Sequence, residues 1–262
     1  MRSSLIVGVV LMLALVGGTV SAIAFAATAP APQPGSSSQL MNSFLPFFSL
    51  FSLSPFSSGS VPVSISSSIN ATSPDLSLTL HVSTGTVSLS FSNQTQNSYR
   101  ITGSMAKNSA PPKVLLVGTA LGVWLPVGDF TVTLPASLRY TANIAMDTGT
   151  LNLDLSGAAV TEVNATLGTG TMSFDVDGAM TRQVALDVSV GMLSGTIHAG
   201  GSGVQATAST NTGTASVQGT GLVTVSQAQG FQEVRTGNFD SASLKCVVRL
   251  QVDLGTVSAE VG

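Results

Sequence analysis

The stretch DTGTLNLDLSG, residues 147–157, is followed by LGTGTMSFDVDG, residues 167–178. Each contains a Thr-Gly-Thr triplet, then alternating apolar and polar residues, then a closing glycine. The glycines of the two triplets, Gly149 and Gly170, lie 21 positions apart. Self-similarity at a fixed spacing is typical of repeat architectures, so this pair is the starting point for predicting the fold.

The same glycine recurs along most of the chain at one or two multiples of about 21 residues. The members of this set are Gly85, Gly128, Gly149, Gly170, Gly191, Gly213 and Gly255. Apolar residues mostly occupy the second, fourth and sixth positions after each glycine, as Leu151, Leu153 and Leu155 do after Gly149. This period of two indicates a strand with one buried face, and a similar alternation precedes several of the glycines. Each unit is therefore predicted to be two short strands joined at a glycine corner, and the fold class all-β.

Two architectures for a single domain fit this alternation. One is a β-solenoid whose coils of about 21 residues stack in parallel on one another. The other is an antiparallel sandwich or meander of hairpins. Equivalent positions carry matching polar residues, which favours stacked coils, because like residues then form ladders across neighbouring strands. The matching pairs are Asn143 and Asn164, Thr150 and Thr171, Asp154 and Asp175, and Ser173 and Ser194. Two segments, near residues 106 and 234, lack the pattern and are predicted to be irregular coils or insertions.

The repeats resemble the adhesin-like toast-rack family of extracellular β-solenoid domains. The residues that carry the resemblance are STGTVSLS 83–90, DTGTLNLDLSG 147–157, LGTGTMSFDVDG 167–178 and NTGTASVQGTG 211–221, and it covers about residues 75–262. The resemblance implies an extracellular, adhesin-like domain. It supplies no catalytic residue to carry over.

The N-terminal part of the chain differs from the repeats. Residues 5–27 are apolar and follow the single cation Arg2, so residues 1–27 are predicted to be a signal peptide or a helix that anchors the chain in a membrane. Residues 28–72, rich in Pro, Ser and Phe, are predicted to be a linker, and 73–262 the β-repeat domain. Either form of the N-terminus predicts export to the cell surface or the medium.

Composition excludes several classes of function. Only 8% of residues are charged and the net charge is -3, so no cluster of cations is present to bind nucleic acid. The single cysteine, Cys246, lies in an alternating apolar segment and is expected to be a buried core residue.

Few side chains suggest chemistry. Asp154, Asp175 and Asp177 could line one face as acid and base or as calcium ligands, but they occupy solvent-facing positions where other repeats carry polar residues such as Ser90, Thr196 and Glu260. His81 and His198 lie far apart in the sequence without a second ligand at metal spacing. We therefore expect no catalytic residue, no metal site and no cofactor.

Three aromatic residues, Trp124, Tyr140 and Tyr99, could stack on a sugar ring or be isolated surface or end-cap residues. Asn70, Asn93 and Asn164 lie in Asn-x-Thr sequons, which makes them candidate glycosylation sites in an exported protein.

The sequence predicts a non-catalytic, exported cell-surface protein with a structural or adhesin-like role. Its expected partners are the cell envelope or a surface glycan, copies of itself, and the membrane if the N-terminal helix is retained. Two alternatives stay open: an extracellular enzyme acting on polysaccharide, and a pilin-like filament subunit.

Overall fold

A computed structural model describes residues 59–69, 73–93, 97–157 and 159–262. The predicted N-terminal helix and most of the predicted linker lie outside these residues. The described part is all-β, and its strands are β1 (Ser60–Ser68), β2 (Asp75–Ser92), β3 (Ser98–Ala106), β4 (Lys113–Val117), β5 (Ala120–Leu125), β6 (Gly128–Pro135), β7 (Arg139–Asp154), β8 (Ala159–Asp177), β9 (Gln183–His198), β10 (Gly203–Gly219), β11 (Leu222–Ala228), β12 (Phe231–Thr236) and β13 (Lys245–Val261). β1 lies within the segment 28–72 that the sequence assigned to the linker.

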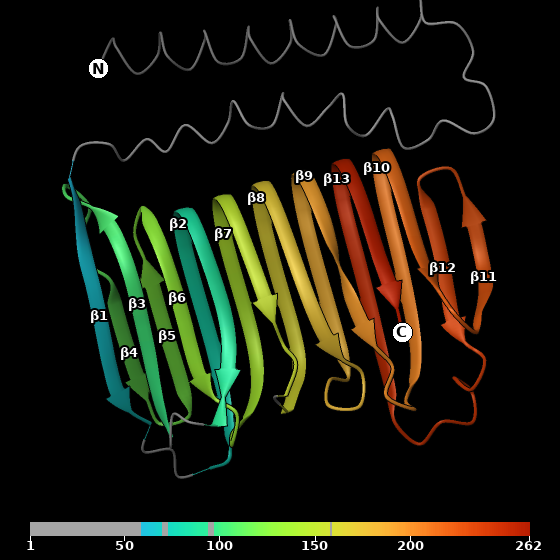
Figure 1. Cartoon of the computed structure of the whole chain (residues 1–262), viewed down its shortest axis with the longest axis horizontal. Helices are drawn as coiled ribbons and strands as arrows, with labels where there is room; N and C mark the ends of the chain where they lie inside the picture. The colour runs from blue at the N-terminus through green and yellow to red at the C-terminus, as the bar shows by residue number, and fades with distance from the viewer. Residues whose placement is uncertain (1–58, 70–72, 94–96, 158) are drawn as a thin grey trace, which may run out of the picture. The chain divides into compact units, whose positions relative to one another are not determined.

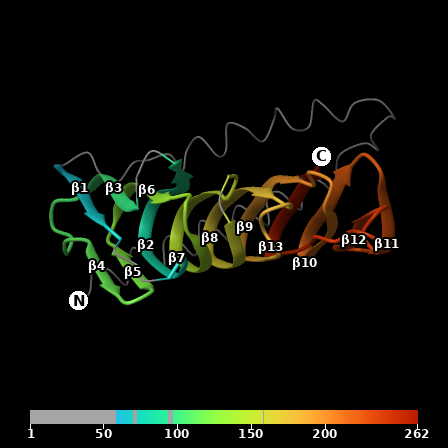
Figure 2. The same ribbon diagram turned by 90° about the horizontal axis from the view of Figure 1, so that it is seen from below.

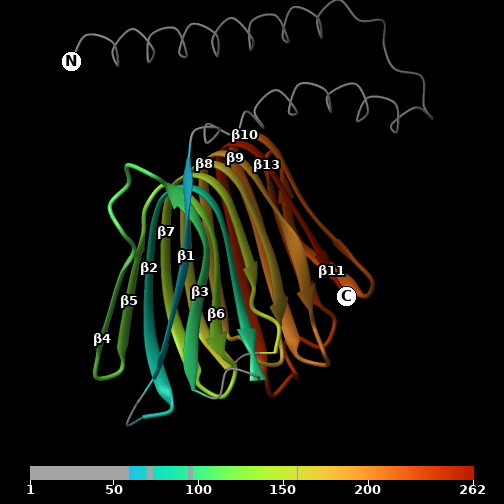
Figure 3. The same cartoon turned by 60° about the vertical axis from the view of Figure 1, so that its left-hand side comes forward.

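Six long strands, β2, β7, β8, β9, β10 and β13, each bend in the middle and run through both layers of the domain (Figures 1 and 3). We call the part before the bend the first arm and the part after it the second arm. The layers are seen from below in Figure 2, where β4 and β5 lie in one and β1, β3 and β6 in the other. Apolar side chains that alternate along both arms, such as Ile144 and Leu151 of β7, point between the layers and form one buried core.

The long strands pair in parallel with their corner glycines in register. Gly149 of β7 pairs with Gly170 of β8, and Gly170 pairs with Gly191 of β9. The predicted 21-residue spacing and glycine corner are thus confirmed in these strands. The antiparallel meander is wrong for the same strands, because consecutive units pair in parallel rather than as hairpins.

The strand order does not follow the chain. β13, the C-terminal strand, lies between β9 and β10 and is parallel to both. β2 pairs with β7 on one side. On its opposite side, the first arm of β2 pairs with β5 and the second arm with β6. The expected solenoid, in which each coil stacks on the one before it, is therefore not confirmed; the domain is one large, mostly parallel sheet in which β7, β8 and β9 are neighbours in chain order.

The two segments without the repeat pattern form antiparallel strands near the two ends of the sheet. The segment near residue 106 is the end of β3, which pairs antiparallel with β6. The segment near residue 234 is β12, which pairs antiparallel with β10. These segments run against the parallel strands and have no corner, so they need neither the glycine nor the 21-residue spacing.

Candidate functional site

The outward face of the second arms is a regular array of small polar side chains. Its central row contains Ser88, Asn152 and Ser173, which are neighbours across β2, β7 and β8. The Asn152 amide donates a hydrogen bond to Ser88 Oγ at 3.3 Å, and Ser173 Oγ donates one to Asn152 Oδ1 at 2.6 Å. These side chains satisfy one another along the row, so they stabilise strand stacking rather than forming a recess for a ligand.

The three aspartates named from the sequence are brought close together on this face. Asp154 and Asp175 are directly paired across β7 and β8. Asp175 Oδ1 lies 3.0 Å from His198 Nε2, while Asp154 and Asp177 each accept a hydrogen bond from the backbone of the following loop, from Ser156 N and Ala179 N. All three face outward along the sheet surface.

The sequence predicts no metal site, and the three aspartates with His198 are the side chains at which one would be sought. Within residues 59–262 that the structure describes, no group of three His, Cys, Asp or Glu side chains could hold a metal ion. His81, exposed on β2, is opposite Trp124 of β5 rather than near His198 of β9.

Cys246 is fully buried, as the sequence predicted. Burial, together with the negative charge of Asp177, raises the pKa of the Cys246 thiol to about 12. The thiol therefore stays protonated near neutral pH and is a poor nucleophile.

The three aromatic residues do not form one surface. Tyr140 is buried in the core, where its hydroxyl donates a hydrogen bond of 2.6 Å to the Pro135 carbonyl and its ring contacts Phe91. Burial raises the pKa of Tyr140 well above its usual value. Tyr99 is also buried. The expectation that either tyrosine is a surface residue is wrong, because both occupy inward positions of their strands, and only Trp124 is exposed.

Trp124 lies flat on the outer surface of the first-arm layer. A Cβ placed on Gly122 would meet the far edge of the indole at 2.5 and 2.7 Å, so the ring covers Gly122, two residues earlier on β5. Two basic residues flank the ring, since Trp124 pairs with Lys113 of β4 on one side and with His81 of β2 on the other. The side chain remains 40% exposed.

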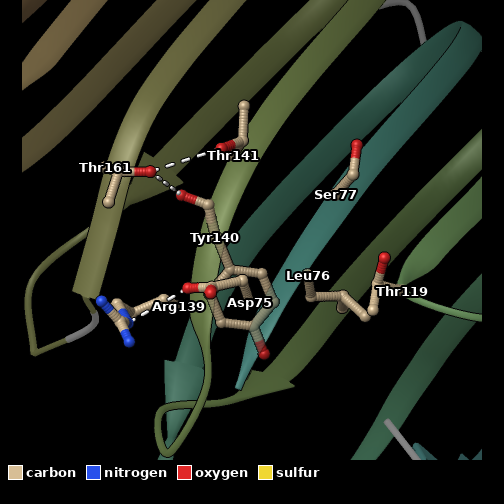
Figure 4. Close-up of a pocket in the computed structure, with 8 residues that line it drawn as sticks. All are labelled: Asp75, Leu76, Ser77, Thr119, Arg139, Tyr140, Thr141 and Thr161. Carbon is tan, nitrogen blue, oxygen red and sulfur yellow. Dashed lines mark hydrogen bonds and ion pairs between the residues drawn. The ribbon is translucent and has the colours of Figure 1, made fainter. Parts of the chain in front are cut away.

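A cleft of about 330 Å³ opens where β2, β7 and β8 begin (Figure 4). Its polar lining includes Ser77, Thr119 and Thr141, and the ion pair between Arg139 Nε and Asp75 Oδ1, which are 3.1 Å apart. Ser77 is outward-facing on β2, on the same layer surface as His81. The cleft and the Trp124 surface therefore lie on one face of the domain.

The candidate glycosylation sites have different surroundings. Asn93 is exposed, just after β2. Asn164 lies in the middle of β8, where its amide donates hydrogen bonds to Glu162 Oε1 at 3.0 Å and to Asn143 Oδ1 at 3.5 Å. Asn70 lies outside the described residues.

No family model matches the chain, and no curated protein matches it. Among solved structures, the chain is similar to a "putative cell adhesion protein" from Clostridium sporogenes, with a TM-score of 0.63 and 13% identity over 77% of this chain and all of that one. A "putative adhesin" from Bacteroides fragilis gives a TM-score of 0.26 at 8% identity, over 76% of this chain and 97% of that one. The first similarity shows that the two proteins share a fold, and the second is too weak to argue from.

Sequence reasoning did not identify the cleft, because Asp75 and Arg139 are far apart in the chain and meet only through pairing of β2 with β7. It also missed the arrangement of Lys113 and His81 around Trp124. The pairing of β5 with β2 has the same 43-residue offset as the repeat glycines Gly85 and Gly128, a signal that could have placed His81 beside Trp124. The pairing of β5 with β4 is indicated by no repeat signal. No helix long and apolar enough to cross a membrane is found among the described residues.

Proposed function

We propose that this chain is an exported, non-catalytic protein of the cell surface with an adhesin-like role. The observation that supports this most directly is the fold, which it shares with a protein named as a "putative cell adhesion protein". The proposal includes a modified β-solenoid: stacked long strands, with extra strands added at the two ends of the sheet. Such a domain presents two wide, polar surfaces at fixed spacing, which suits contact with a large or repetitive partner.

The composition supports the same role. With 8% charged residues and many hydroxyl and amide side chains, the surface changes little in charge with pH. In this proposal the N-terminal apolar segment directs export or holds the chain at the membrane, and the residues between it and β1 connect it to the β-domain. A surface glycan or the cell envelope is the proposed partner.

The test is to locate the native protein and to measure attachment. Surface labelling of intact cells should modify the protein, and deleting the gene should reduce binding of the cells to surface glycan or envelope material. Protein found only inside intact cells would contradict the proposal. Breakdown of a polysaccharide by the purified chain would favour the enzyme alternative, and filaments in electron micrographs would favour the pilin-like one.

A further inference from the structure

We infer that the outer face of β4, β5 and the first arm of β2 binds a polysaccharide that carries carboxylate groups, with Trp124 as the stacking surface. This inference rests on the proposed function, because it supplies the site through which such a protein would attach. It concerns the first-arm layer, which is opposite to the second-arm face that carries the aspartates.

The position of the indole is the first argument. The ring of Trp124 covers Gly122, so one of its faces lies against the sheet and the other faces outward. A flat, outward indole presents an apolar surface matched to the C–H face of a sugar ring. Trp124 is the only tryptophan in the chain, and an indole left 40% exposed on a strand needs an explanation that core packing does not give.

The surrounding residues give the second argument. Thr79 pairs with Gly122, and His81 and Lys113 pair with Trp124, so hydrogen-bonding groups border the indole on the β2 side and at Lys113 of β4. The other β4 residue beside the ring is the exposed Leu115, opposite Gly122. Ala145, on the far side of His81, is small and leaves the surface open. An apolar plane bordered by polar groups fits a sugar, which has an apolar ring face and hydroxyl groups at its edge.

The charge of this face indicates which class of polysaccharide it would bind. Residues 59–139 carry four Lys and Arg against two carboxylates, whereas residues 140–262 carry four against ten. Not all of these charges lie on the proposed face: Arg100 of β3 and Asp129 of β6 belong to the other layer, and Lys107 follows β3. On the proposed face, Asp75 is paired with Arg139. Lys113 therefore has no carboxylate competing for it on β4, β5 or the first arm of β2 apart from the paired Asp75, and a carboxylate of the ligand complements Lys113 beside the indole.

The cleft extends the same surface. Thr119, which lines it, precedes Trp124 by five residues along the chain, a span of roughly 16 Å for an extended strand. A polymer lying along β5 could contact the indole and reach the cleft, whereas a single sugar could not. We therefore expect affinity to rise with ligand length.

Fluorescence of the full-length chain tests the site, because its only indole is Trp124. Polygalacturonate is the probe, dextran is the neutral control and monomeric galacturonate is the length control. Polygalacturonate should shift or quench the emission in a saturable way, more weakly at high salt, and dextran should not. Equal binding of dextran, or no change with either polymer, would overturn the inference.

Variants separate stacking from charge. With binding measured by calorimetry, Trp124→Ala should weaken polygalacturonate binding about tenfold or more, and Lys113→Gln about threefold. Lys245→Gln removes the same charge from the start of β13 and should leave the affinity unchanged. Unchanged affinity in Trp124→Ala would overturn the inference.

Gly122→Ala provides a second test with the indole retained. The added methyl would displace the far edge of a side chain rather than backbone, so the fold should survive while the ring is lifted from the sheet. Affinity should fall although Trp124 is present. Unchanged affinity with an unchanged emission spectrum would contradict the flat arrangement.

Leu115 and Val117 of β4 are also exposed, at 56% and 63%, so a second copy of the chain is the competing occupant of this face. Emission that depends on protein concentration without polysaccharide, together with dimers in sedimentation, would overturn the inference. The proposed function fails separately: protein absent from the cell surface contradicts that function, whereas normal cell attachment by Trp124→Ala contradicts only this site.

Discussion

Gly170 of β8 lies against the carbonyl oxygen of Gly149 of β7, and a Cβ on Gly170 would overlap that oxygen. Gly191 of β9 stands in the same relation to Gly170. The φ angles of Gly170 and Gly191 are +141° and +145°, a conformation that side chains with a Cβ rarely adopt. The corner is therefore both a backbone requirement and a contact between strands, which explains why glycine recurs there.

The first prediction concerns this contact. Gly170→Ala should lower the free energy of unfolding by about 3 kcal/mol or more, because backbone strain adds to a clash with the backbone of β7. Gly118→Ala is the matched control: Gly118 has φ +59°, but nothing lies within 4 Å of its added Cβ, so the loss should be about 1 kcal/mol. Denaturant unfolding measures both, and equal losses would contradict the added cost of the corner between β7 and β8.

The second prediction concerns the end of the parallel stack at β10. The Gln232 side chain accepts a hydrogen bond from Val217 N at 2.8 Å and donates one to Val217 O at 3.1 Å, as a neighbouring strand would. Gln232→Glu removes the donor and should destabilise the domain by about 1–2 kcal/mol and speed amide exchange of Val217. Gln227→Glu, an exposed position on β11, is the control for the added charge and should change stability little. A similar loss in both variants would contradict a specific role for Gln232.

The third prediction concerns pH. The Cys246 pKa is raised from 9.0 to about 12 in the folded chain, so between these values the unfolded chain releases a proton that the folded chain keeps. Stability should therefore fall as pH rises through this range, with a slope approaching about 1.4 kcal/mol per pH unit from this group. Cys246→Ala should lack this contribution. The measurement is the free energy of unfolding of both proteins at several pH values between 9 and 12, and the contribution is the difference between the two slopes. The same change of unfolding free energy with pH in both proteins would contradict the prediction.

The fourth prediction concerns the Tyr140 hydroxyl. Tyr140→Phe leaves the Pro135 carbonyl without its 2.6 Å hydrogen bond inside the core and should cost about 1–3 kcal/mol. Tyr99→Phe, at another buried tyrosine, is the comparison. If thermal unfolding shows a smaller loss of stability for Tyr140→Phe than for Tyr99→Phe, the hydrogen bond to Pro135 is not important for stability.

The candidate site shows where sequence reasoning was limited. The sequence groups Trp124 with Tyr99 and Tyr140 as possible sugar-stacking residues, but the two tyrosines are buried and Trp124 is exposed. Whether an aromatic residue faces in or out depends on its position in a strand. Tyr140 begins an inward alternation that continues with Ala142 and Ile144 of β7, a signal that could have placed it in the core, whereas Tyr99 lies on β3, outside the repeats. Lys113 could not be predicted as a neighbour of Trp124, because β4 lies outside the repeat pattern. His81 precedes Trp124 by the same 43 residues that separate Gly85 from Gly128, so the repeat contained this pairing.

The sequence by itself determined which side chains face the core and where each long strand bends. Both are local properties: alternation selects the buried face, and only glycine fits the corner between stacked backbones. The tertiary structure alone decided the strand order, including the place of β13 between β9 and β10 and of β5 and β6 beside β2. The physical reason is that every long strand offers its neighbours nearly the same pattern of backbone groups and corner glycine, so the repeat cannot specify which strand lies beside which.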